Sequence, residues 1–264
     1  MKVKYLLVPI LSLLLTSCNS DEDLNTNDIV QTALPLIDSN YWTYNVNSQT
    51  TNSIPETWTR DSLYVANDTL INNVTHKKMK TLPINNGFYS GFLKNNGLRI
   101  DGSSLKLSGS IGISAVLPVD FSFSVTDFVI LKENATNGEQ LSSTSGSFMQ
   151  KLGGYPLTFE YTFYSEGNGT MASYTSNGIT YNDITKSKVI LNLKITTSFS
   201  GITVPIMNAQ DVLVSSQYYS KNIGLVYNHT VINYTLNSNP LLPIDFPESA
   251  NQIVEEFLDV YLLN

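Results

Sequence analysis

The sequence predicts an all-β protein, a large curved antiparallel meander followed by one C-terminal α-helix. Long segments alternate apolar and polar residues, as strands with one buried face do. Asn-Gly and Gly-Gly pairs separate these segments and favour short antiparallel connections. Charged residues make up only 14% of the chain, whereas Thr, Tyr and Asn, which suit strands and turns, are abundant. On these signals we expect about 11 to 13 strands, with boundaries uncertain by about 2–4 residues.

The first strand is predicted at the Tyr-Trp-Thr-Tyr segment. Trp42, Tyr44 and Val46 alternate there with Thr43 and Asn45, which indicates one buried and one exposed face. Its neighbours further along the chain repeat the same alternation, at residues 105–117, 119–125, 155–163 and 189–195.

The alternation slips by one residue at Asp127, where residues 128–131 become continuously apolar. Such a slip within a long strand is typical of a β-bulge. Gly167-Asn168-Gly169 and Asn177-Gly178 are predicted turns.

The final segment, residues 249–264, is predicted to be a helix packed on the sheet. Ser249 and Gln252 match a capping box, and the apolar residues that follow are spaced as one stripe of a helix. They are Ile253, Val254, Phe257, Leu258, Tyr261 and Leu262.

A long meander that bends can place its apolar residues on a concave face. The first choice of architecture is therefore an open half-barrel, similar to lipoprotein-carrier folds, and a β-sandwich is the second. Concave apolar pockets with few polar groups are common ligand sites. The candidate groove residues are Phe121, Phe123, Tyr155, Phe159, Tyr161 and Phe163.

Residues 1–17 have the three parts of a secretory signal. A basic start with Lys2 and Lys4 is followed by an 11-residue apolar run and the small residue Ser17. The run is too short to span a bilayer, which takes about 20 apolar residues. Cys18, the only cysteine, follows directly.

Leu15-Thr16-Ser17-Cys18 resembles the lipobox of bacterial lipoproteins. The resemblance implies that Cys18 is lipidated, becomes the mature N-terminus and attaches the chain to a lipid bilayer. The acidic residues that follow, Ser20-Asp21-Glu22-Asp23, resemble the export signal that sends Bacteroidota lipoproteins to the outer face of the outer membrane. Residues 18–33 are then a flexible acidic tether.

Two further segments, Tyr41-Trp42-Thr43-Tyr44 and Tyr218-Tyr219-Ser220-Lys221-Asn222-Ile223-Gly224-Leu225-Val226, resemble a family of uncharacterised surface-exposed lipoproteins of Bacteroidota. Residues 61–80 are also similar to this family. Together the resemblance covers about a fifth of the chain. It implies a shared fold and brings no catalytic residues with it.

Charge and length exclude several classes of function. The net charge of −7 becomes −9 when Lys2 and Lys4 leave with the signal. An acidic chain without a basic cluster argues against binding to nucleic acid or to an anionic membrane surface. With Cys18 lipidated, no disulfide and no cysteine ligand for a metal remain. The mature 247 residues suit a single β domain at residues 34–248 before the helix.

The sequence predicts no catalytic residues, no metal site and no cofactor. His76, beside Lys77 and Lys78, is expected to be exposed. His229 is in phase with apolar neighbours, which allows an inward position, and a hydrogen-bonded structural role is favoured for it. Glu160 and Glu166 are the nearest paired carboxylates, and a solvated face is the favoured interpretation.

The predicted function is therefore a non-enzymatic, surface-anchored protein that binds an apolar or amphipathic ligand, including a lipid, in the groove. The first alternative is a structural or protein-interaction module of an outer-membrane complex, which predicts an exposed aromatic patch. The second is a glycan-acting hydrolase, which needs two carboxylates in a cleft. Ser62 and Thr69 lie in Asp-(Ser/Thr)-aliphatic segments and are candidates for O-glycosylation.

Overall fold

The computed structural model describes residues 32–50, 53–82, 84–112, 119, 121–152, 154–199, 201–237 and 247–264. The chain divides into two compact units, Met1–Val30 and Gln31–Asn264, and all described residues belong to the second. Cys18 and the export signal Ser20–Asp23 lie outside the described residues. None of the described helices is long and apolar enough to cross a membrane.

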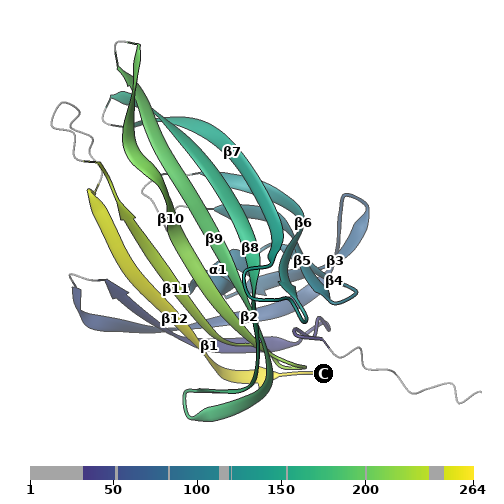
Figure 1. Ribbon diagram of the computed structural model, residues 1–264. Helices are drawn as coiled ribbons and strands as arrows, with labels where there is room; N and C mark the ends of the chain where they lie inside the picture. The colour runs from purple at the N-terminus through teal and green to yellow at the C-terminus, as the bar shows by residue number, and fades with distance from the viewer. Residues whose placement is uncertain are drawn as a thin grey trace, which may run out of the picture. The chain divides into compact units, whose positions relative to one another are not determined.

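The second unit is one 12-stranded sheet (Figure 1). Its order is β6-β5-β4-β3-β2-β1-β12-β11-β10-β9-β8-β7, and the paired strands are antiparallel. The elements are β1 Tyr41–Thr50, β2 Ser53–Ile71, β3 Val74–Thr81, α1 Phe88–Leu93, β4 Gly97–Asp101, β5 Ser104–Gly112, β6 Ser122–Lys132, β7 Gln140–Leu152, β8 Tyr155–Ser176, β9 Ile179–Phe199, β10 Ile202–Ser220, β11 Gly224–Thr235 and β12 Ser249–Leu262. The predicted curved meander is confirmed, and the two-sheet sandwich is wrong.

The predicted C-terminal helix is also wrong, because this segment forms β12. It lies between β1 and β11 and pairs with both. In the strand, Val254 and Leu258 are buried while Ile253 and Phe257 face outward and are half-buried. The spacing that resembled a helical stripe therefore supplies apolar residues to both faces, and hydrogen bonding to two neighbours outweighs the local helical pattern.

The sheet curls around α1, with β8, β9 and β10 on one side and β2 to β5 on the other (Figure 1). Inward residues form one core. Trp42 and Tyr44 of β1 are fully buried, as the alternation predicted, and the Trp42 indole N–H donates to the carbonyl of Ile223 at 2.6 Å.

The sheet's two edge strands, β6 and β7, are joined through serine side chains of β7 and β8. The Val129 N–H donates to Ser142 Oγ at 2.8 Å, and Ser165 Oγ donates to the Val129 carbonyl at 2.5 Å. These bonds satisfy backbone groups of β6 that would otherwise be free to pair with another chain.

The predicted bulge at Asp127 is confirmed. The β5–β6 register shifts between Leu107 and Gly109, and Asp127 adopts a φ of +52°. Asn177-Gly178 turns between β8 and β9 as predicted. The predicted turn at Gly167, however, is a register shift inside the long strand β8.

The folded unit begins earlier than predicted. The Asn222 N–H donates to the Thr32 carbonyl at 2.8 Å, and the Thr32 N–H donates to Asn222 Oδ1 at 3.2 Å. Ala33 and Leu34 are buried. Thr32 and Ala33, which the sequence assigned to the tether, are therefore part of the β unit.

Candidate functional site

The six predicted groove residues come together on the inward face, four from β8, Phe123 from β6 and Phe121 from the position directly before β6. Phe123, Phe159 and Phe163 are buried there, while Phe121, Tyr155 and Tyr161 are half-buried. Phe121 stacks on Phe148 with ring centroids 3.6 Å apart, and Phe123 stacks on Tyr161 at 4.7 Å. These rings therefore contact one another on the face that the groove hypothesis assigned to a ligand.

Helix α1 is held inside the sheet by carboxylates from two strands. It has six residues and no side-chain cap of its own, so its first N–H groups need acceptors from elsewhere. Asp61 of β2 accepts from the N–H groups of Asn86 and Gly87 at 2.9 and 2.7 Å, and from the Ser90 hydroxyl. Glu256 of β12 accepts from the N–H groups of Tyr89 and Ser90 at 2.8 and 3.2 Å.

Glu256 is completely buried. Its pKa is raised to about 7, chiefly by burial and also by the charge of Asp61, while the N–H donors of Tyr89, Ser90 and Asn228 act in the opposite direction. The Asn228 amide donates to Glu256 Oε2 at 2.6 Å. The two acids are thus fixed parts of the interior and do not open into a cleft.

Gly87 is required for this arrangement. A Cβ at this position would lie 2.0 Å from Glu256 Oε1, closer than any real contact. The absence of a side chain lets the segment before α1 approach the carboxylate, and that segment then forms part of a pocket wall.

The pocket beside α1, here called the α1 pocket, has a volume of about 320 Å³. It lies between α1 and residues of three strands, which are the last residues of β5, Ile232 of β11, and Gln252 and Val254 of β12. Apolar side chains form its walls, and amide and hydroxyl groups also line it. Its lining includes Phe88, Phe92, Ile111, Asn85, Ser110 and Gln252.

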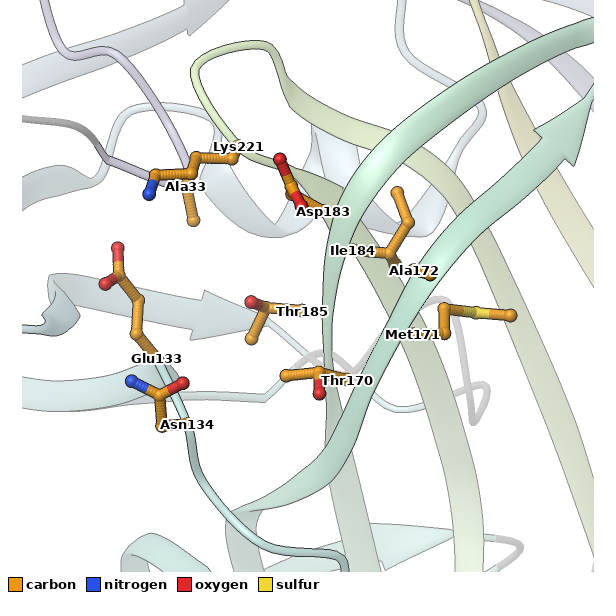
Figure 2. A pocket seen from close by; sticks show the side chains of 10 residues that line it. All are labelled: Ala33, Glu133, Asn134, Thr170, Met171, Ala172, Asp183, Ile184, Thr185 and Lys221. Atoms are coloured by element: carbon orange, nitrogen blue, oxygen red, sulfur yellow. The ribbon is translucent and has the colours of Figure 1, made fainter.

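A second pocket, of about 420 Å³, has a polar lining (Figure 2). Here called the Glu133–Asp183 pocket, it also includes Ala33, Asn134 and Lys221. Asp183 has a φ of +51° and Asn134 a φ of +60°, backbone conformations that Asp and Asn tolerate better than most residues.

On the outer face, rings from five strands form an aromatic row. Trp58 is 57% exposed and stacks on Phe257 with centroids 6.0 Å apart. Phe257 contacts Tyr227, and Tyr227 contacts both Tyr218 and Tyr174. The convex side therefore also carries apolar surface.

His76 is not exposed as expected, and His229 does not take the inward position that its phase allowed. His76 is only 2% exposed, and its Nε2 lies 3.0 Å from Ser108 Oγ. His229 is opposite Ser216 and Glu255 in the register, on the outer face. In the part of the chain that the structure describes, no group of three or more His, Cys, Asp or Glu could hold a metal ion.

The remaining predicted site residues are separate from both pockets. Ser62 and Thr69 are half-buried on β2. Glu160 lies 3.2 Å from Lys194 Nζ, and Glu166 lies 2.9 Å from Lys188 Nζ. Each carboxylate is neutralised by a lysine on β9, so the structure does not bring Glu160 and Glu166 together as a catalytic pair.

Comparisons with known proteins give little further information. No protein-family model and no curated protein matches the chain. Among solved structures, the chain is similar to a "putative lipoprotein" from Parabacteroides distasonis, with 10% identity, 88% of this chain and 99% of that chain covered, and a TM-score of 0.34.

Proposed function

We propose that the chain is an exported, non-enzymatic binding protein that is anchored by lipid and holds a small amphipathic ligand in the α1 pocket. The anchor is Cys18, acylated and inserted in the outer membrane, and the acidic segment Ser20–Asp23 directs the protein to the cell exterior. The lipid bilayer is thus its first partner.

The observation that carries this proposal is the lining of the α1 pocket. Phe88, Phe92 and Ile111 offer apolar contact, while Asn85 and Gln252 offer amide groups. Such a combination suits a molecule with one apolar and one polar end. A volume of about 320 Å³ lies at the small end of ligand pockets, which span about 300–1,000 Å³, and favours a short amphiphile over a whole phospholipid.

The α1 pocket is tested by native mass spectrometry of the mature chain carrying Cys18→Ser, purified without detergent. We expect a bound mass that organic solvent releases. Gln252→Trp should reduce its occupancy, because the indole occupies space at the pocket's lining. Gln49→Trp, on the outer face of neighbouring β1, is the matched control and should retain the ligand.

An apo mass for the parent protein, or equal losses in the two tryptophan variants, would contradict ligand binding in this pocket. Those outcomes would favour the alternative, a module that contacts an outer-membrane protein. The observation that supports the alternative is the outer aromatic row, with Trp58 57% exposed at its end.

The anchor is tested in cells. Cys18→Ser should abolish labelling by palmitate and move the protein from the membrane fraction to the soluble fraction, because no acyl chain is attached. Replacement of Asp21, Glu22 and Asp23 by Ala should leave the label intact but remove the protein from the reach of protease added to whole cells. Unchanged labelling of the Cys18→Ser variant would contradict the anchor.

A further inference from the structure

The Glu133–Asp183 pocket gathers two carboxylates that lack a partner. Most acidic side chains among the described residues form an ion pair or a hydrogen bond. Glu133, Asp183 and Glu248 form none, and the first two line this pocket. Two unneutralised carboxylates around one cavity favour binding of a cation.

Backbone hydrogen bonds position the segments that carry these carboxylates. The β6–β7 loop, which contains Glu133, is fixed on β8, because the Gly167 N–H donates to the Glu139 carbonyl at 2.8 Å and Gly138 donates to Gly167 at 2.9 Å. A Cβ at Gly167 would lie 2.6 Å from that of Ala135, so only glycine allows this approach.

Lys221 follows β10, and its backbone N–H donates to the Asp183 carbonyl at 3.2 Å. Although the two backbones touch, no ion pair joins the Lys221 ammonium to Asp183 or Glu133. Figure 2 shows Glu133 and Asn134 on one side of the pocket, Asp183 on the other, and Lys221 along the rim beside Ala33. The pocket thus presents separate negative and positive groups to one ligand.

We propose that the Glu133–Asp183 pocket binds a zwitterion that carries a primary ammonium group next to an anionic group, such as a phosphoethanolamine. The ammonium N–H groups donate to the carboxylates of Glu133 and Asp183, and the anion pairs with Lys221. The hydroxyls of Thr170 and Thr185, which also line the pocket, are available for further hydrogen bonds.

This chemistry has two sources, a free small molecule or the headgroup of a membrane lipid. Ala33 lines the pocket, and Cys18 precedes Thr32 by 14 positions. A tether of that length reaches at most about 50 Å, so lipidation at Cys18 would keep Thr32 within that distance of lipid headgroups. The hypothesis that the ligand is a lipid headgroup rests on the proposed anchor, whereas binding of the zwitterion itself does not.

The test titrates the mature Cys18→Ser protein with O-phosphoethanolamine, followed by calorimetry at low ionic strength. We expect saturable binding, with phosphocholine at least about tenfold weaker because its quaternary ammonium has no N–H to donate. Glu133→Gln with Asp183→Asn should weaken binding by a similar factor. Glu248→Gln, which removes the other unpartnered carboxylate, is the matched control and should bind as the parent does.

Flotation with vesicles separates the two sources. Binding to phosphatidylethanolamine vesicles but not to phosphatidylcholine vesicles, lost in the double variant, supports the headgroup. Binding of the soluble compound alone supports a free ligand. No saturable binding in either arm, or binding that the double variant and the control alter equally, would overturn the proposal. None of these outcomes bears on the α1 pocket, which is tested separately by native mass spectrometry.

Discussion

Deletion of residues 249–264 is expected to abolish folding of the remaining chain. The segment forms β12, which lies at the middle of the sheet and joins β1 to β11. Its removal exposes two new strand edges and empties the space of Val254 and Leu258. Each buried aliphatic side chain contributes about 1.5–3 kcal/mol, and the whole stability of such a domain is only about 5–15 kcal/mol.

The lost contacts include more than apolar surface. Glu256 leaves with the strand, so the buried N–H groups of Tyr89 and Ser90 lose their acceptor. The Asn228 amide loses its partner as well. Buried donors without partners cost about 1–3 kcal/mol each. The position of α1 inside the sheet is then no longer stabilised by Glu256.

The measurement is the dispersion of amide signals in a two-dimensional NMR spectrum of residues 19–248. A collapsed spectrum is expected, and addition of a synthetic peptide of residues 249–264 should restore dispersion by supplying the missing strand. The control peptide carries Glu256→Pro, which removes an N–H and cannot pair on both sides. A truncated chain with the dispersion of the full protein would contradict the central position of β12.

The error over this segment shows what local pattern can and cannot predict. Period-two alternation identified β1, β8 and β9 because each has one apolar and one polar face. β12 is apolar on both faces, since Val254 points inward and Phe257 packs against Trp58 outside. Two interleaved apolar faces resemble a helical stripe, and only the neighbours in the sheet decide between them.

The candidate site was not predicted, because none of the six predicted groove residues lines the α1 pocket. The predicted groove residues do lie in or against the core, but the sequence does not show that Phe121 would stack on Phe148. Asp61 and Glu256 lie 195 positions apart, and nothing local marks either as buried. α1 was missed because six residues form less than two turns, and its capping groups come from distant strands.

Glu256 gives rise to the second large effect, a stability that falls as the pH rises. Its pKa is about 7 in the folded protein against 4.5 for an ordinary glutamate. The folded state therefore holds a proton between these values that the unfolded state has lost. This stabilisation is fully present below about pH 4.5 and is lost as the pH rises through about 7.

Between pH 5 and pH 8 the Glu256 contribution should decline by about 2.5 kcal/mol. Denaturant titrations at both pH values measure it. Glu256→Gln should remove this decline, because the amide cannot ionise, even if an altered hydrogen bond to Ser90 shifts the free energy of unfolding equally at both values. Its neighbour Glu255, which faces outward and accepts the Tyr227 hydroxyl, supplies the matched control Glu255→Gln.

Other ionisable groups near Glu256 could also contribute to the change of the free energy of unfolding with pH. Asp61 and the hydroxyls of Tyr44, Tyr89 and Tyr219 interact electrostatically with Glu256. Burial raises the pKa of all three tyrosines, so none of them ionises between pH 5 and pH 8. A slope that persists in Glu256→Gln and disappears in Glu255→Gln would contradict the assignment. The expected opposite result would assign the slope to Glu256, whose oxygens accept from the N–H groups of Tyr89 and Ser90 in α1.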